Sequence, residues 1–374
     1  YQPLVSLSLL LDARFIADWT GASFHFHFTN WLLQLLNVAL LFALIRSVSG
    51  STPWAVLGGL IFGVHPAQVE SVAWIAQRGT LLATFFSLLA LLAYLRYGRT
   101  GRFRWFIPVI FCYAAAMLSA PTFLGLPVGF LILDIWPLRR LGWRPILEKA
   151  PLLVLLLVGL GLHYNLRLHG EPLRAAAAGP GGWQLLTRNL AAMAAKIVWP
   201  VDLTPFNPFP PRTALSGLGR LVDAAVLILL PAGLVLTFRY SRPLFTALAG
   251  VMMLVFPGLI DAPLAGQLLS DHYLYAVWIM PCIAWAAWIK TRGDILHRPW
   301  GRCVAMSLAA AAAIFAARAN IQTYYWHDSR VLCQHAANLY PDWAGGHMAL
   351  VESCIREGDL DSALVYARRA VDAV

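Results

Sequence analysis

The sequence has very few charged residues. Asp, Glu, Lys and Arg make up 12% of its 374 residues, against about 25% in soluble globular domains. Hydrophobic residues make up 59% of the chain, and the mean hydropathy is +0.66. A soluble protein of this length cannot bury so much apolar surface in one core. The composition therefore excludes an ordinary soluble domain and predicts a protein that is solvated by lipid.

Cysteine is also scarce. The five cysteines show no CxxC pattern and no Cys/His spacing, so we expect no metal site. Three of them lie in apolar segments, where cysteine behaves as a small hydrophobic residue. Cys333 and Cys354 share a more polar tail. They can form a disulfide if that tail is outside the cytoplasm, or they can pack inside helices as free thiols.

An initiator Met and a signal peptide are both absent. The sequence opens at Tyr1 and stops inside a predicted helix. We therefore expect the natural protein to continue beyond both ends.

Basic residues are concentrated in every second loop, and the short loops between, such as 119–121 and 261–271, have none. More than half of the 28 Lys and Arg lie in five short loops, at Arg46, Arg96–Arg104, Arg139–Lys149, Arg239–Arg242 and Lys290–Arg302. Chains that cross a bilayer keep such loops in the cytoplasm. The alternation predicts a polytopic membrane protein. It places residues 65–78, 119–121, 167–216, 261–271 and 319–374 on the outer side.

The net charge of +10 has the same origin. These cations lie at the ends of apolar segments, where they meet anionic lipid headgroups. We therefore expect membrane lipids as partners and no nucleic acid.

Apolar runs predict about ten spanning helices. They lie near 28–46, 53–64, 79–97, 103–119, 121–136, 150–166, 217–238, 243–261, 272–290 and 300–318. Two amphipathic stretches, 1–18 and 183–200, are expected to lie in the outer interface. The Pro-rich stretch 204–211 is expected to be an extended outer loop.

The chain changes character at Trp326. Pro341 ends a helix expected at 328–340. The positions that follow fit a 34-residue tetratricopeptide repeat, and they are Leu350, Gly358, Ala363, Ala367 and Ala370. Because one repeat cannot bury its own apolar face, more repeats are expected after Val374. The predicted fold is all-α: a transmembrane helix bundle at 1–318, followed at 319–374 by the start of an extracytoplasmic repeat domain.

Short motifs follow one another along the chain in a fixed order. They are Tyr1-Gln2-Pro3-Leu4, His27-Phe-Thr-Asn30, HPAQVESVAWIAQR at 65–78, Ser119-Ala-Pro121, LPVGFLILDIWPLRR at 126–140, Lys196-Ile-Val-Trp-Pro200-Val-Asp-Leu203, Asp271-His-Tyr-Leu-Tyr275 and Trp326-His-Asp-Ser329. By these motifs and their order, the chain resembles bacterial relatives of the transmembrane and tetratricopeptide-repeat O-mannosyltransferases. That family belongs to the GT-C glycosyltransferase superfamily.

The resemblance implies a GT-C-like bundle in the bacterial inner membrane with its repeats in the periplasm. It also implies inverting transfer of a sugar from a polyprenyl-phosphate carrier, with no cofactor. A carboxylate in the first outer loop acts as the base, and cations in the outer loops stabilise the leaving phosphate. The repeats would hold a protein acceptor or a partner subunit. The family's acidic pair is expected upstream of Tyr1, so the catalytic base is unknown. The nearest carboxylates, Asp12 and Asp18, are interpreted as solvated residues of the interfacial helix.

Candidates for contacting the donor or acceptor lie in the predicted outer segments. They are His65, Glu70, Arg78, Lys196, Asp271 and His272. Each has a structural alternative. His65 can form a turn at a helix end, and Glu70 can pair with Arg78. Arg78 and Lys196 can instead contact lipid headgroups. Asp271 and His272 can cap the start of a helix. Trp74 is interpreted as a packing residue. Asp134 is predicted to pair with Arg139 or Arg140 near the cytoplasmic end.

Four positions depart from the family pattern. Relatives tend to have a cation where this chain has Gln2, Gly79, Ala120 and His272. Because a leaving phosphate needs positive charge, two hypotheses stay open. One is a working transferase with an altered donor site. The other is a catalytically degenerate descendant that serves as a membrane scaffold or accessory subunit. A transporter fits less well, since few charges lie within the spans.

Overall fold

The computed structural model describes residues 2–15, 22–170, 182–208, 217–265, 270–293 and 295–373, and its regular elements there are all helical. The all-α prediction is therefore confirmed for this part of the chain. The helices are α1 Pro3–Arg14, α2 Ala22–Ser49, α3 Thr52–Val64, α4 Gln68–Ala73, α5 Arg78–Thr100, α6 Phe106–Ser119, α7 Leu126–Ile135, α8 Trp143–Leu147, α9 Ala150–Gly170, α10 Gly182–Val198, α11 Gly217–Tyr240, α12 Arg242–Ala265, α13 Ile279–Arg292, α14 Pro299–Tyr325, α15 Ser329–Leu339, α16 Ala344–Glu357 and α17 Leu360–Asp372, with short 3₁₀ turns that include η2 Ile75–Gln77, η4 Pro121–Phe123 and η6 Asp271–Leu274.

A helix occupies each of the ten predicted apolar runs. Six helical stretches of the described chain are long and apolar enough to cross a membrane, and the apolar helices at Thr52–Val64, Phe103–Ser119, Pro121–Ile135 and Arg242–Phe256 are shorter. The chain is thus an integral membrane protein. Several predicted boundaries differ from the structure by a few residues; α2, for example, begins at Ala22 and not near 28. The span expected to end at 318 continues to Tyr325, and the span expected from 272 opens as the 3₁₀ turn η6 before α13 begins.

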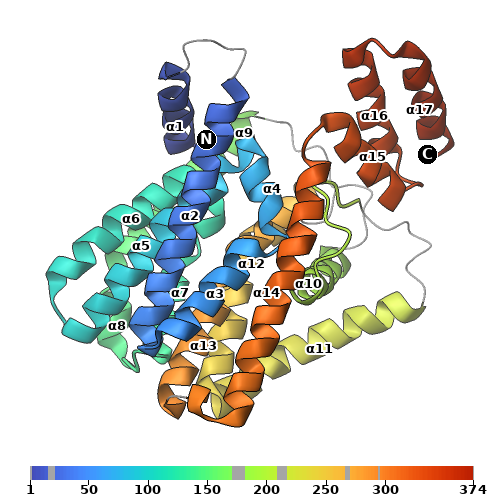
Figure 1. The fold of residues 1–374 in the computed structure, drawn as a ribbon. Coiled ribbons are helices and arrows are strands. Elements are labelled where there is room, and N and C mark those ends of the chain that lie inside the picture. Colours follow the sequence, from blue (N-terminus) through green and yellow to red (C-terminus); the bar gives the residue numbers. More distant parts are fainter. Residues whose placement is uncertain are drawn as a thin grey trace.

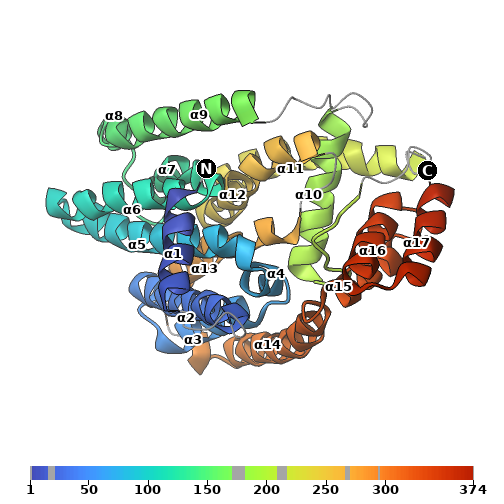
Figure 2. The ribbon, with the colours of Figure 1, turned by 90° about the horizontal axis from the view of Figure 1, so that it is seen from above.

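The bundle has a buried centre and a lipid-facing rim. Of the 18 most apolar consecutive residues in Ile75–Thr100, which contains α5, 72% are buried inside the protein. The corresponding value is 67% for Asp271–Arg292, which contains α13, against 6% for α11 and 11% for α14. Figure 2 shows α9, α11 and α14 at the edges of the bundle. Small residues allow close crossings inside the bundle. A Cβ on Gly250 of α12 would lie 2.4 Å from Met280 Cβ of α13.

The two ends of the bundle differ in charge. The basic loop between α13 and α14 lies at the bottom of Figure 1 and the one between α5 and α6 at its lower left, while α4 and the C-terminal helices lie toward the top. At the basic end, Asp134 pairs with Arg140 at 3.6 Å, as predicted, and also with Lys149, which the sequence analysis missed. Arg139 lies instead over the ring of Trp136, 4.9 Å from its centroid.

Helices α15, α16 and α17 follow α14 as a separate group at the end opposite the α13–α14 loop, which we call the outer end after its predicted orientation (Figure 1). The helix predicted at 328–340 is α15. It is capped by the Asp328 carboxylate, which accepts a hydrogen bond from Arg330 N at 2.6 Å. Gly358 ends α16 in the left-handed conformation with φ +78°, which glycine adopts without steric cost. Cys333 and Cys354 are buried free thiols. The assignment of these helices to a tetratricopeptide repeat, and the domain boundary at 318, stay predictions.

Candidate functional site

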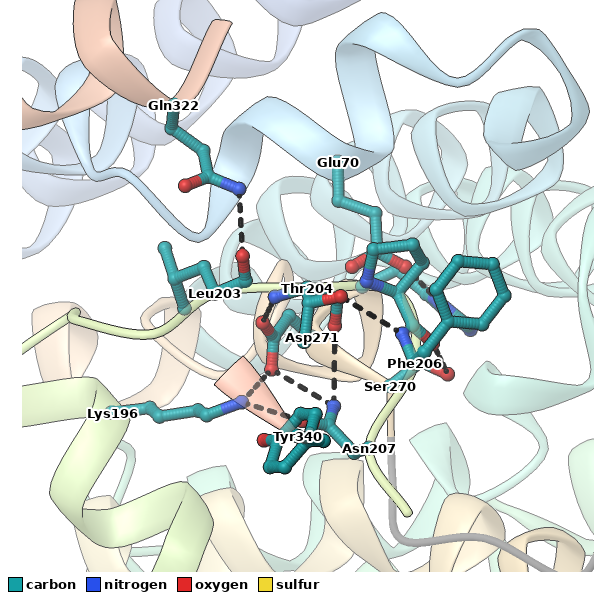
Figure 3. Close-up of polar contacts among 12 residues, drawn as sticks. Glu70, Lys196, Leu203, Thr204, Phe206, Asn207, Ser270, Asp271, Gln322 and Tyr340 are labelled. Atoms are coloured by element: carbon teal, nitrogen blue, oxygen red, sulfur yellow. Dashed lines mark hydrogen bonds and ion pairs between the residues drawn. The ribbon is translucent and has the colours of Figure 1, made fainter. Parts of the chain in front are cut away.

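The outer end of the bundle holds a cluster of polar side chains from two parts of the chain that are distant in sequence, shown in Figure 3. Helix α10 brings Lys196, η6 brings Asp271, and the loop after α10 brings Thr204 and Asn207. The Asp271 side chain is 2% exposed, so its charge needs partners in place of water.

Asp271 receives those partners from both sides. One carboxylate oxygen accepts a hydrogen bond from Lys196 Nζ at 2.6 Å and lies 3.4 Å from Asn207 Nδ2. The other accepts one from the backbone N–H of Thr204 at 2.9 Å. Asp271 is the first residue of the 3₁₀ turn η6, and Ser270 occupies the capping position before it. No side chain makes a capping hydrogen bond at this end of η6. The helix-cap alternative for Asp271 is therefore not what the structure shows.

The neighbouring residue extends this cluster toward α4. His272 Nδ1 lies 2.8 Å from Glu70 Oε1, and the Glu70 side chain is 4% exposed. The ring of Trp74, 39% exposed, lies edge-on to His272 with 6.4 Å between centroids, and Trp326 lies 6.0 Å beyond it. We call Lys196, Asp271, Glu70 and His272 the outer cluster. The Lys196 and His272 side chains are each 16% exposed, so the cluster is partly open to the surface.

Arg78 belongs to a second set of contacts. The guanidinium donates to Asn30 Oδ1 at 2.9 Å, to the Phe26 carbonyl at 2.8 Å and to the Asp12 carboxylate. The arginine is 0% exposed and the Asp12 side chain is 14% exposed. Asp12 is thus the ion-pair partner of Arg78, which corrects its interpretation as a solvated residue. Asp18 lies outside the residues that the structure describes.

His65 lies in a third, aromatic environment. Its ring contacts Trp278 and Phe315, with centroids 5.1 and 4.8 Å away, and its Nδ1 accepts the N–H of Ala67 at 3.3 Å. Burial lowers the pKa of His65 to about 4, so the ring is neutral at pH 7. The structure therefore brings four of the six predicted residues together and places Arg78 and His65 apart from them.

Three of the four positions that depart from the family pattern also meet. A Cβ on Gly79 would lie 2.7 Å from the carbonyl oxygen of Ser119 and 2.8 Å from Gln2 Oε1. Ala120, the next residue after Ser119, is buried. Close packing of neutral groups thus occupies the place where the resemblance led us to expect cations.

Sequence reasoning missed a polar stripe on α2. Asn30, Gln34 and Asn37 are buried. Asn37 donates to the Leu81 carbonyl at 3.1 Å and lies 3.0 Å from the Tyr275 hydroxyl, which also bonds Gln34. The signal was available, because spacings of four and three residues put all three amides on one helix face. The stripe fixes η6 against α2 and so positions Asp271 and His272.

Comparison with known proteins supports the resemblance found in the motifs. No protein-family model matches the chain. The chain is 27% identical over 154 residues to Protein O-mannosyl-transferase TMTC2 of Mus musculus, which covers 39% of this chain and 18% of that protein. It is 30% identical over 155 residues to the Xenopus laevis tmtc2 protein, covering 40% and 18%. It is 36% identical over 100 residues to Drosophila melanogaster Tmtc2, covering 26% and 10%.

These findings confirm the recognised resemblance at the level of the class. The described part of the chain is a helical membrane protein, and part of it is similar to protein O-mannosyl-transferases of the TMTC group. The matched region spans less than a fifth of the length of these relatives. The similarity supports a membrane glycosyltransferase-like function at the level of the family.

Proposed function

We propose that this chain binds a polyprenyl-phosphate sugar at the outer cluster and acts as a glycosyltransferase on a protein acceptor. The observation that carries the proposal is the convergence of Lys196, Asp271, Glu70 and His272 at the outer end of a membrane bundle. Lysine binds phosphate as a point charge, and buried carboxylates accept hydrogen bonds from sugar hydroxyls.

Lys196 is the group best placed to contact the donor phosphate. Its ammonium has three N–H donors, and two of them are used, by Asp271 and by Asn207 Oδ1 at 3.0 Å. The side chain is 16% exposed, so the third donor can reach a ligand. In the proposed complex, Asp271 holds the ammonium in place while that donor bonds the phosphate.

The neighbouring pair and the tail complete this assignment. Glu70 and His272 lie beside Trp74, where they would contact the sugar. Tyr340, at the end of α15, donates to Asn207 at 3.3 Å. A protein acceptor or partner subunit held by the C-terminal helices would therefore lie next to the bound donor. We place this end of the protein in the periplasm of a bacterial inner membrane.

The experiment measures donor binding by the purified protein in detergent, with polyprenyl-phosphate mannose as the probe. Losing a charge-assisted hydrogen bond costs about 1.5–3 kcal/mol, so Lys196→Met should weaken binding about tenfold or more. Arg104→Met, at an exposed position of the basic end, is the control and should bind normally. Transfer of labelled mannose to a Ser/Thr-rich peptide then tests turnover. Unchanged binding by Lys196→Met would contradict the assignment.

The second candidate function, a non-enzymatic scaffold, is favoured by a separate observation. Arg78 is neutralised inside the chain by Asp12, and Gly79 is packed against Ser119 and Gln2. A phosphate site there would have to break a buried ion pair. If the purified protein binds no lipid-linked sugar and transfers none, while it captures a partner subunit through α15–α17, the scaffold describes the protein.

A further inference from the structure

A small polar pocket of about 400 Å³ lies at the basic end of the bundle. It is lined by residues 49–54, around the start of α3, and by Ile289, Lys290 and Gly293, around the end of α13. Its volume falls within the ~300–1,000 Å³ range of ligand pockets. Within this described lining no residue is Asp or Glu, and Lys290 carries the one formal charge. The pocket is therefore electropositive.

The start of α3 contributes backbone donors to the pocket. Thr52 is the first residue of this 13-residue helix, and Ser51 occupies the capping position without making a side-chain capping hydrogen bond. The N–H of Ala55 donates to the carbonyl of Ser51 at 3.3 Å. The N–H groups of Thr52 and Trp54 come before this bond, where an α-helix offers no internal acceptor. The helix N-terminus also adds a partial positive charge.

The side chain of Trp54 adds a second, independent donor. Trp54 lines the pocket and is 1% exposed, and no described residue accepts a hydrogen bond from its Nε1. Its ring meets Trp285 edge-on with 5.7 Å between centroids, so packing fixes the indole. An indole N–H can only donate, and a buried donor without an acceptor costs free energy. An acceptor atom bound in the pocket would remove that cost.

Lys290 supplies the full positive charge. Its side chain is exposed, and the described part of the chain provides no ion-pair partner for it. The pocket thus combines an ammonium, an indole N–H, backbone N–H groups at a helix start and the hydroxyls of Ser51 and Thr52. A phosphate group, with its negative charge and several acceptor oxygens, matches this set of donors. A metal cation would be repelled by Lys290.

We propose that this pocket binds a phosphate group, carried either by a phospholipid headgroup or by free phosphate. The bound group would connect the start of α3 to the end of α13 at the basic end of the bundle. The lipid-linked sugar of the proposed function has its phosphate at the opposite end, beside Lys196. The phosphate pocket is therefore a separate site, and it does not depend on that function.

Two probes test the proposal on the detergent-purified protein: inorganic phosphate in a calorimetric titration, and phosphatidylglycerol in native mass spectrometry. Saturable binding of at least one probe is expected. Trp54→Phe keeps the ring and removes the N–H, so it should weaken binding about tenfold, the usual effect of losing one hydrogen bond to a charged group. Trp278→Phe is the matched control, because its Nε1 is also buried without a described partner but lies outside this pocket. It should bind normally.

A second variant separates loss of the site from loss of the fold. Thr52→Glu places a carboxylate at the first residue of α3, where a negative charge suits the helix dipole. The variant should therefore keep the thermal midpoint of the unaltered protein while it loses phosphate binding. Thr100→Glu makes the same change at an exposed position of the basic end and should bind normally.

The outcomes are distinct. Binding of inorganic phosphate supports a site for the free anion, and binding of phosphatidylglycerol alone supports a headgroup site. Failure of both probes to bind would overturn the proposal, as would equal losses in Trp54→Phe and Trp278→Phe, or full binding by Thr52→Glu. Asp294 lies outside the described residues. If binding appears only in Asp294→Asn, these donors serve the chain's own carboxylate and the proposal is wrong.

Discussion

The role of Arg78 is determined by its burial beside a charged partner, Asp12. Arg78 is an instructive case, because a cation in the family's most specific motif suggests a free phosphate contact. The structure instead gives it Asp12, Asn30 and the Phe26 carbonyl. A fully enclosed guanidinium with three partners contributes to the position of α1 against α2 and α5.

Breaking this pair should destabilise the protein strongly. Removing one partner of a buried ion pair costs about 3–5 kcal/mol, because it leaves the other charge uncompensated. Asp12→Asn should therefore lower the thermal midpoint of the detergent-solubilised protein. The double variant Asp12→Asn with Arg78→Gln should lose less than the sum of the single variants. Additive losses would show that the two side chains do not interact.

His65 should make the stability depend on pH. Burial lowers its pKa to about 4 in the folded protein, against about 6.5 when unfolded. As the pH falls, the imidazole of the unfolded chain therefore binds a proton at a higher pH than that of the folded protein. Stability is constant above pH 6.5 and falls between pH 6.5 and 4, by at most ~1.4 kcal/mol per pH unit.

The variant His65→Asn keeps an acceptor for the Ala67 N–H and cannot titrate in this range. Its thermal midpoint, measured from pH 7.5 to 4.5, should fall less than that of the unaltered protein. His327→Asn, an exposed position, is the control and should follow the unaltered protein. Parallel curves for all three proteins would contradict the role of His65.

At the scale of elements, the loop after α10 joins the membrane bundle to the C-terminal helices. Leu203 O accepts from Gln322 of α14 at 3.0 Å, and Phe206 packs against Trp343 with ring centroids 5.7 Å apart. Asn207 contacts both Lys196 and Tyr340. The outer cluster and the tail therefore share one loop as their common support. Residues 209–211, which the Pro-rich prediction also covered, lie outside the described residues.

Removing the Tyr340 hydroxyl should loosen this connection. The hydrogen bond to Asn207 is worth about 1 kcal/mol, so Tyr340→Phe should raise hydrogen exchange in the backbone at 203–208 and weaken donor binding modestly. Tyr324→Phe, at an exposed site on α14, is the matched control. If exchange at 203–208 is unchanged, the tail does not support the loop.

The whole molecule is polarised: the basic α13–α14 loop lies at one end of the bundle, and the C-terminal helices lie at the other (Figure 1). The positive-inside pattern assigns the basic end to the cytoplasm. The orientation is a prediction that labelling can check, and it decides where a donor phosphate and an acceptor protein meet.

Two exposed positions make this test direct. In a Cys303→Ala background, Thr100→Cys lies at the basic end and Ala76→Cys at the outer end, and both positions are exposed. A membrane-impermeant maleimide applied to spheroplasts should label Ala76→Cys alone. Thr100→Cys should react only after the membrane is permeabilised. Labelling of both positions in intact spheroplasts would refute the topology.

The sequence by itself determined the class of this protein. Apolar run lengths and helical spacing are local properties, so they predicted the helices near the correct bounds and the all-α fold. The alternation of arginines separated the two ends, and the motif order identified the related transferases. These signals need no knowledge of which segments touch.

Tertiary structure alone decided the chemistry of the site. Lys196 and Asp271 are 75 residues apart, and Arg78 and Asp12 are 66 residues apart, so no local pattern could pair them. Packing also determined that Gly79 faces Ser119 and Gln2. A charge in a low-dielectric interior is stabilised only by the partner that the fold brings to it. For that reason, two candidate cations received different surroundings: Lys196 pairs with Asp271 in the outer cluster, and Arg78 forms an internal ion pair with Asp12.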